Sequence, residues 1–314
     1  MPDEVEVRNT LSEPAARQLA NATKTRAQML AITPRWLITF LPWVPVEAGI
    51  YRLNKVKERE GLGAVECSPT WERDIDLPET FVDYETTPRE YFLNAVTTVL
   101  DVQTRVSDLY NQPYDQIQEQ LRLLIEKVKE RQESELIYNP DYGILTNAVS
   151  WMRISTRGGP PTPDDFDELI SKVWKEPAFF LAHPRAIAAF GRECTQRGVP
   201  PPTINLFGTP FLTWRGIPLV PSDKLKIEGA ANGAGGKTSI LLMRTGEKKQ
   251  GVIGLFQPGV PGEVTPSLSV RFMGINRKAI SSYLISLYCS SAILTEDAVG
   301  VLENVDIGHY YEYT

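Results

Sequence analysis

Apolar residues recur at helical spacing in four segments of the chain. The first segment opens with Thr87-Pro88-Arg89-Glu90, which combines an N-cap, a first-turn proline and a capping-box glutamate. The apolar positions behind it are Phe92, Val96, Val99, Leu100 and Val106. This spacing predicts a helix that begins at Thr87 and extends to Val106.

The second helical segment is the longest. It begins near Pro113 or Asp115, ends at Asn139-Pro140 and predicts a rod of about 36 Å that acts as a spine. Its apolar face comprises Ile117, Leu121, Leu124, Ile125, Val128 and Leu136. Its polar face places opposite charges four residues apart, namely Arg122 with Glu126, Lys129 with Glu133, and Arg131 with Glu135.

Two shorter helices follow. Thr162-Pro163 starts the third, and its predicted apolar face is Phe166, Leu169, Ile170, Val173 and Trp174. The fourth runs from Pro184 through Ile187, Phe190 and Cys194 and stops at Gly198.

From Thr203 onward the pattern changes to short apolar runs, which predict strands over 204–207, 211–214, 240–243, 252–256 and 268–272. The segment 282–293 alternates serines with apolar residues and predicts a half-buried strand. Pro218 and Pro221 argue against a good strand over 217–224. Thr295 is expected to cap a short closing helix over 295–302. The predicted fold class is α+β, with helices early and a mixed sheet late.

The N-terminal region does not predict an independent domain. Pro34, Pro42 and Pro45 interrupt its most apolar stretch, so this stretch cannot be one continuous helix. Trp36, Phe40 and Trp43 still require burial, against the chain's own body or against a neighbour. Residues 46–82 are expected to form two extended pieces around Glu60–Gly63 and a charged, irregular stretch.

Composition and charge argue against several classes of partner and site. The chain has 314 residues, a net charge of −6 and no run of basic residues, which argues against nucleic acid as a partner. Three distant cysteines argue against a disulfide framework and a zinc site, and His183 and His309 are expected to be structural. The acidic N-terminus is unlike a signal peptide, and the apolar stretch is too short for a membrane span. A cytoplasmic location is the expectation.

One stretch, Gly229–Ser239, resembles a phosphate-binding loop because it ends in Gly236-Lys237-Thr238. Such a loop needs a buried strand before it and a helix after it. The residues after Lys237 instead predict a strand, and Pro218 and Pro221 interrupt the segment before it. We interpret the stretch as a mobile loop between strands, with no nucleotide or other cofactor bound.

No other motif indicates catalysis. The carboxylates Asp164, Asp165, Asp167 and Glu168 occupy the first turn of a predicted helix, where they favour the helix dipole. The tail Tyr310–Tyr313 is expected to dock on a surface. The residues therefore predict no catalytic, cofactor-binding or metal-binding site.

Several stretches spread over nearly the entire chain resemble the encapsulin nanocompartment shells of the second family, subgroup 2A, which includes SrpI-like proteins. They are 15–25, 32–37, 43–52, 77–85, 131–137, 213–223 and 269–276. The element order also resembles a phage major capsid protein of the Hong Kong 97 type. The resemblance implies an N-terminal arm (1–45), an extended loop (46–86), a helical P-domain with the spine helix (87–143), a mixed α/β A-domain (144–281), and a final strand with a C-terminal helix and tail that return to the P-domain (282–314).

The resemblance implies a function as well. It implies a homo-oligomeric icosahedral shell of T=1 type in the cytoplasm, which is not itself an enzyme. The enclosed cargo would be a cysteine desulfurase carrying pyridoxal phosphate, in sulfur metabolism or storage. Trp36, Phe40 and Trp43 would then find burial on neighbouring copies and favour assembly.

By analogy with the capsid fold, Gly198, Val199, Pro200, Pro201 and Pro202 would rim a pore, although an ordinary rigid turn explains this stretch equally well. Two other functions stay open at this point. One is a phage or prophage capsid protein of the same fold. The other is a peripheral membrane protein, which only the aromatic residues of the arm suggest.

Overall fold

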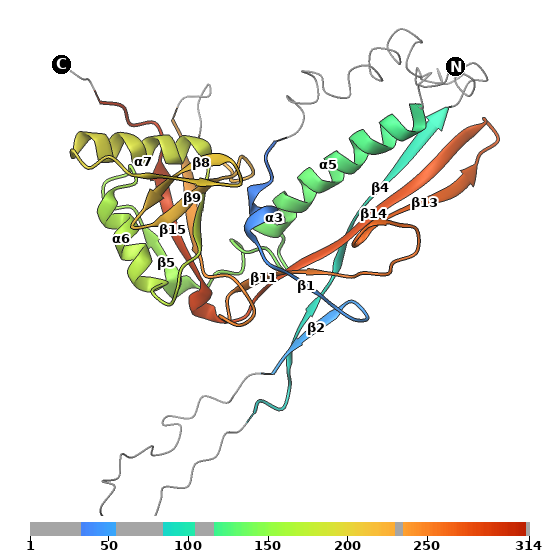
Figure 1. The fold of residues 1–314 in the computed structure, drawn as a ribbon, viewed down its shortest axis with the longest axis horizontal. Coiled ribbons are helices and arrows are strands. Elements are labelled where there is room, and N and C mark those ends of the chain that lie inside the picture. Colours follow the sequence, from blue (N-terminus) through green and yellow to red (C-terminus); the bar gives the residue numbers. More distant parts are fainter. Residues whose placement is uncertain (1–32, 55–83, 104–115, 230–234, 312–314) are drawn as a thin grey trace, which may run out of the picture.

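The structure is a computed structural model that describes residues 33–54, 84–103, 116–229 and 235–311. In it, the long helix α5 (Gln116–Tyr138) lies along a sheet that contains the long strands β4 (Asn94–Gln103) and β14 (Ile280–Ile293) (Figure 1). This sheet has the order β1 (Trp43–Pro45), β11 (Val252–Phe256), β14, β13 (Leu268–Ile275) and β12 (Glu263–Thr265), with β4 also paired to β14. Four residues of the apolar face predicted for the spine helix, Leu121, Leu124, Ile125 and Val128, pack in one cluster with Ile285 and Leu287 of this sheet, whereas Leu136 packs with the seven-stranded sheet described below.

The helix predicted from Thr87 to Val106 is wrong. Residues 89–92 form β3 and residues 94–103 form β4, which pairs antiparallel with β14 over ten positions, from Asn94 opposite Cys289 to Gln103 opposite Ile280. Along β4 the more buried residues are the even-numbered ones, so the period is two. Val96, Thr97, Thr98 and Val99 are β-branched and favour a strand once a partner strand is available. The predicted helical P-domain thus contains a single described helix, α5.

A second sheet of seven strands forms the other lobe. Its order is β5 (Arg153–Ser155), β15 (Val299–Asp306), β10 (Lys237–Met243), β6 (Phe179–Ala182), β9 (Ile217–Pro221), β8 (Thr209–Trp214) and β7 (Thr203–Leu206). Both faces are covered, so the middle strand β6 is apolar and buried throughout. Phe180, Ala182 and Leu242 pack with α6 (Pro163–Lys172) and α7 (Pro184–Gln196), whereas Phe179, Leu181 and Leu241 pack with the C-terminal end of α5 and with Leu37.

Two expectations for this sheet are wrong. Residues 295–302 contain a single 3₁₀ turn, η2 (Glu296–Ala298), and then enter β15, because Val299 and Val301 lie between β10 and β5 in the core. The proline-interrupted segment 217–221 is a central strand, β9. Its prolines are its second and last residues, and the buried Leu219 and Val220 between them pair with Phe180 and Leu181.

The remaining predicted elements are present, with small shifts of their ends. Thr162 caps α6 through a capping box with Asp165, and His183 caps α7 by accepting a hydrogen bond from the Arg185 N–H, which confirms its structural role. Gly198 follows α7 at φ +69°, a backbone conformation that favours glycine. Trp174, predicted on the apolar face of the third helix, is 70% exposed because α6 ends at Lys172.

Strands β2 (Ile50–Leu53) and β3 (Arg89–Phe92) form a two-stranded antiparallel sheet. This small sheet projects from the part of the molecule that contains α5 and the long strands (Figure 1). It accounts for the start of the extended region predicted over 46–82. The turn Glu60–Gly63, like Cys67, lies outside the described residues. The division of the chain into five segments stays a prediction.

Candidate functional site: the arm junction

We call the contact of residues 33–46 with the rest of the chain the arm junction. It includes a short helix, α3 (Trp36–Phe40), and strand β1. Leu37 and Leu41 are buried, and they pack with Leu136 and Ile137 of α5 and with strands of the seven-stranded sheet. The last residues of the predicted arm therefore belong to the core of the chain.

The aromatic residues of the junction pack on the chain's own seven-stranded sheet. The centroid of the Trp36 ring lies 5.1 Å from that of Phe211, and the centroid of the Phe40 ring lies 5.2 Å from that of Phe179. Phe207, at the tip of the β7–β8 hairpin, contacts both Trp36 and Phe40. The chain's own body thus supplies part of the burial that Trp36, Phe40 and Trp43 require, and all three are half-buried within one chain. That their remaining exposed surface packs against neighbouring copies stays a prediction.

Trp43 fixes the second half of the junction. Strand β1 pairs parallel with β11, with Trp43 opposite Gly254, and the Trp43 indole N–H donates to the Ile38 carbonyl at 2.9 Å. Beside it lies an open pocket of about 380 Å³, walled by residues that include Ile38, Trp43, Gln132, Phe256 and Leu287. The pocket thus lies between Ile38 and Trp43 of the junction, Gln132 of α5, and Phe256 and Leu287 of the long sheet.

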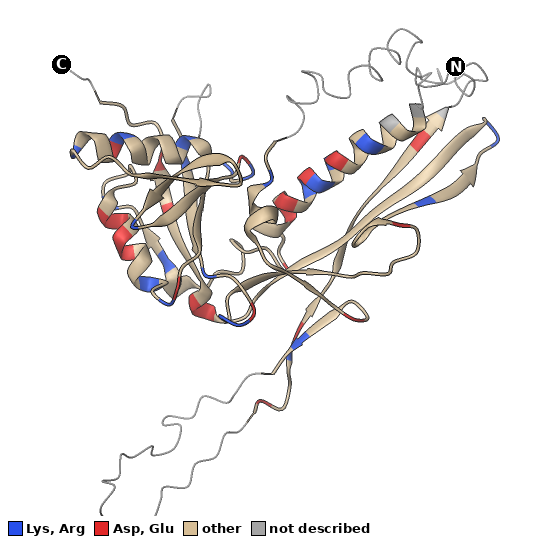
Figure 2. Ribbon diagram, viewed as in Figure 1, with Lys and Arg blue, Asp and Glu red and all other residues tan. Residues whose placement is uncertain are grey.

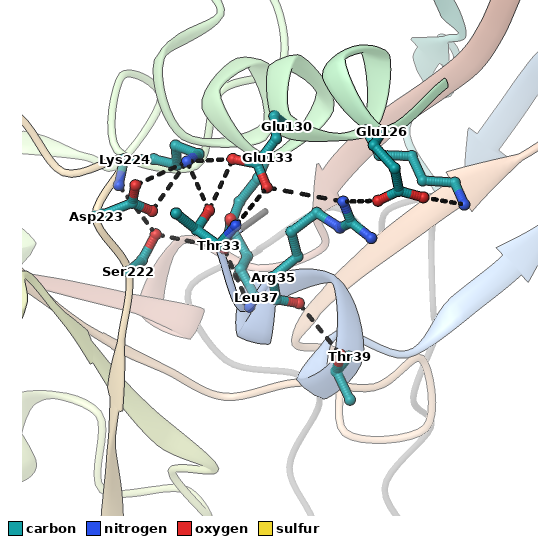
Figure 3. A network of polar contacts seen from close by, with 11 residues as sticks. Thr33, Arg35, Leu37, Thr39, Glu126, Glu130, Glu133, Ser222, Asp223 and Lys224 are labelled. Carbon is teal, nitrogen blue, oxygen red and sulfur yellow. Dashed lines mark hydrogen bonds and ion pairs between the residues drawn. The ribbon is translucent and has the colours of Figure 1, made fainter. Parts of the chain in front are cut away.

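Polar contacts tie the start of the junction to α5 (Figure 3). Arg35 pairs with Glu126 at 2.6 Å and also approaches Glu130 at 3.7 Å. Thr33 donates to Glu130 through its N–H and its hydroxyl. Acidic and basic residues alternate along α5 (Figure 2), so the helix offers carboxylates to these cationic and N–H groups.

The turn after β9 brings a lysine to the same place. Lys224 Nζ lies 2.5 Å from Glu130 and 2.9 Å from Asp223, and it donates to the Thr33 hydroxyl at 3.0 Å. Asp223 and Glu130 thus share one cation. The junction joins three parts of the chain: the N-terminal segment, the spine helix and the seven-stranded sheet.

Glu133 differs from the other carboxylates of the junction. Its side chain is fully buried, and its Oε1 accepts from the Leu37 N–H and the Ser222 hydroxyl, each at 3.3 Å. Its Oε2 has no hydrogen-bond partner among the described residues. Burial raises the pKa of Glu133 to about 7, against a partial opposing effect of the Leu37 N–H and Lys224.

The charge pairs predicted on α5 have three outcomes. Arg131 and Glu135 pair at 2.5 Å, as predicted. Lys129 pairs with Glu126 at 3.6 Å, so its predicted pair with Glu133 is wrong; Glu133 points into the junction instead. The pair of Arg122 with Glu126 stays a prediction. A sequence pattern locates charges on one helix but does not show what packs over them.

The glycine-rich stretch lacks the structural setting of a phosphate loop. Glu228 and Lys237 exchange backbone hydrogen bonds of 2.8 Å, and Lys237 begins strand β10, not a helix. Residues 230–234 lie outside the described residues. The strand predicted after Lys237 is thus confirmed.

The acidic cluster of α6 stabilises the fold. Asp165 completes the capping box. Asp167 accepts from Arg215 and from the Trp214 indole N–H, and Glu168 pairs with Arg157. These carboxylates therefore have a structural role, as predicted. They act through individual hydrogen bonds and ion pairs, beyond the effect on the helix dipole that we predicted.

The tail docks on α7, as predicted for its first tyrosines. The Arg192 guanidinium lies 4.2 Å from the centre of the Tyr310 ring and donates to the His309 carbonyl, and the Tyr311 hydroxyl donates to Glu193. Tyr313 lies outside the described residues.

The predicted pore rim is an exposed but well-anchored loop between α7 and β7. The Val199 N–H donates to the Cys194 carbonyl, and the Pro202 carbonyl accepts from the Thr213 N–H. Gly198, Val199 and Pro200 follow the end of α7 and are exposed. Its place at a pore stays a prediction.

Other kinds of site find little support in the described ranges. Within 33–54, 84–103, 116–229 and 235–311, no three His, Cys, Asp or Glu side chains are grouped to hold a metal ion. The helices of those ranges include none with the length and apolar character needed to cross a bilayer. Cys194 and Cys289 are buried free thiols.

Known proteins resemble the chain along almost its entire length. A family model described as "SrpI-like: Type 2A encapsulin shell protein SrpI-like" matches residues 51–309. The chain belongs to this family of encapsulin shell proteins. It is 63% identical over 304 residues to the type 2A encapsulin shell protein SrpI of Synechococcus elongatus, and 58% identical over 303 residues to a type 2A encapsulin shell protein of Mycolicibacterium paratuberculosis, each alignment covering 96% of both chains.

Solved structures agree with the family. A holo-SrpI encapsulin complex from Synechococcus elongatus PCC 7942 matches with a TM-score of 0.81 and 59% identity, over 98% of this chain and all of that one. A solved structure from Mycobacterium phage Adephagia matches with a TM-score of 0.58 and 10% identity, over 94% of this chain and 98% of that one. At this low identity the phage protein shows the fold alone, which is the predicted Hong Kong 97-type capsid fold.

These findings decide between the functions left open. The chain is an encapsulin shell protein, and the relatives are named as shell proteins, not as enzymes, which confirms the predicted structural role. The phage-capsid alternative shares only the fold. The membrane alternative loses its support, because the aromatic residues that suggested it are half-buried and pack against the chain's own core.

Proposed function

We propose that this encapsulin shell protein assembles with copies of itself into a T=1 icosahedral compartment in the cytoplasm that encloses a cysteine desulfurase. The supporting observation is the match to a solved encapsulin complex over 98% of this chain, together with the family match over residues 51–309. The cargo would carry pyridoxal phosphate and serve sulfur metabolism or storage. The shell contributes confinement and no cofactor of its own.

Electron microscopy of the purified full-length protein tests the assembly. We expect closed particles of uniform size in the absence of lipid. A compact monomer across a broad range of concentration would contradict the proposal.

Cargo is tested separately by expressing the shell with a cysteine desulfurase. We expect the enzyme, and the visible absorbance of its pyridoxal phosphate, to sediment with the particles. The matched control is a pyridoxal-phosphate enzyme of similar size and unrelated function. Equal sedimentation of both enzymes, or of neither, would contradict the proposed cargo and leave the assembly untouched.

The loop Gly198–Pro202 would rim a pore of this compartment. Replacing Pro200 and Pro201 with tryptophan should slow the entry of small solutes to an enclosed enzyme without preventing assembly. Pro258→Trp, in another exposed loop, is the control. Unchanged entry in the double variant would show that the loop is an ordinary turn.

A further inference from the structure

Glu133 lies where three segments of the chain meet. It belongs to α5, its Oε1 accepts from the Leu37 N–H of α3, and the same oxygen accepts from the Ser222 hydroxyl of the turn after β9 (Figure 3). No part of the side chain is exposed, and Oε2 lacks a partner among the described residues. A single buried carboxyl group therefore connects the N-terminal segment, the spine helix and the seven-stranded sheet.

The charged groups around Glu133 are already paired with one another. Arg35, from the N-terminal segment, is paired with Glu126. Lys224, from the turn, is bound to Glu130 and Asp223. Beyond Asp223 lies His183, whose pKa burial lowers, so it tends to be neutral.

Ionisation of Glu133 would thus place a negative charge in the core with two neutral donors and no cation paired to it. An unpaired buried charge costs far more free energy than a buried carboxylic acid. The surroundings accordingly favour the protonated form. Burial raises the pKa of Glu133 to about 7, so the proton is exchanged near neutrality.

We propose that Glu133 is a proton-dependent latch that holds the N-terminal segment on the spine helix. In the protonated state the Leu37 turn closes over the carboxyl group and excludes water. When the proton leaves, the Leu37 N–H and the Ser222 hydroxyl still stabilise the carboxylate in part, but they do not replace its lost hydration. Water entry or a turn of Lys224 toward Glu133 would compensate for that loss. Water entry separates the Leu37 turn from Glu133, whereas a turn of Lys224 breaks its contact with Thr33. A rise in pH therefore loosens the arm junction.

This inference concerns contacts within one chain, so it does not depend on the proposed cargo. The direction is unusual, because acid holds the latch closed and base opens it.

Hydrogen exchange of the purified full-length protein tests the latch. The probe is a peptide spanning residues 33–41, measured at about pH 5.5 and about pH 8.5 and corrected for the intrinsic exchange rate. We expect its protection to fall at least about tenfold at the higher pH in the wild type. In Glu133→Gln, a neutral side chain of the same shape, the protection should change less than about twofold.

Glu135→Gln is the matched control, because Glu135 lies on the same helix and pairs with Arg131 at the surface. It should keep the wild-type pH dependence. A pH-independent wild type, or a Glu133→Gln variant with the wild-type response, would overturn the proposal. If Glu133→Gln does not fold, infrared difference spectra of the wild type and Glu135→Gln decide: the C=O band of a buried carboxylic acid must disappear over the same pH range, and its absence refutes the latch.

Discussion

The indole ring of Trp43 lies directly against the backbone of Gly254. A Cβ atom at position 254 would stand 2.6 Å from Cε3 of Trp43, well inside van der Waals contact. The two residues are also register partners in the parallel β1–β11 pair. The absence of a side chain at position 254 thus allows the N-terminal segment to lie on the long sheet.

Gly254→Ala should displace Trp43 and destabilise the protein by about 1–3 kcal/mol, because an added methyl group overpacks this contact. The free energy or midpoint of unfolding measures the effect. Gly191→Ala, in the interior of α7 with open space around the added Cβ, is the control and should raise stability by about 0.5–1 kcal/mol. Equal effects of the two substitutions would contradict the packing argument.

Leu37→Ala should destabilise the chain by about 2–5 kcal/mol, because Leu37 is fully buried in the core it shares with α5. Thr39→Ala is the matched control in the same short helix, where the side chain is exposed and should matter by less than about 0.5 kcal/mol. Thermal unfolding of both variants provides the measurement. A Leu37→Ala protein as stable as the control would show that α3 docks only weakly.

Phe207 occupies a left-handed backbone conformation, φ +52°, and its side chain is 66% exposed, yet its ring contacts Trp36 and Phe40. Asparagine suits this turn better than phenylalanine. Phe207→Asn should therefore preserve global stability while it lowers the hydrogen-exchange protection of residues 36–41. Unchanged protection would mean that the ring contributes nothing to the arm junction.

The protonation of Glu133 also predicts the pH dependence of stability. Its pKa is about 7 in the folded chain against an ordinary value of 4.5, so the folded state retains a proton that the unfolded state has lost. The free energy of unfolding should consequently fall as pH rises from 4.5 to about 7, by up to about 3 kcal/mol. Melting curves of the wild type and Glu133→Gln measure this effect. The difference in the free energy of unfolding between the two proteins should change with pH across this range and be constant above it. A difference that stays constant throughout would refute the assignment.

Local sequence signals determined the helices whose ends have capping or turn residues. Thr162 with Asp165, Pro184 after His183, and Gly198 set the ends of α6 and α7, because caps and turn residues act within a few positions. The residue patterns also gave α5 and most strands, and the family resemblance gave the fold.

Tertiary structure decided the rest. Residues 94–103 carry strong helix-start signals upstream, but ten positions of pairing with β14 outweigh them. The sequence left open whether Trp36 and Phe40 pack on the chain's own body or on a neighbour, and the fold places the rings of Phe211 and Phe179 within the same chain against them. Glu133 fits a surface ion pair by its spacing from Lys129, yet it lies in the core, because segments about a hundred residues away in either direction close over it. Spacing along the chain determines which side chains share a helix face, whereas burial, and with it the pKa, depends on what the fold packs against that face.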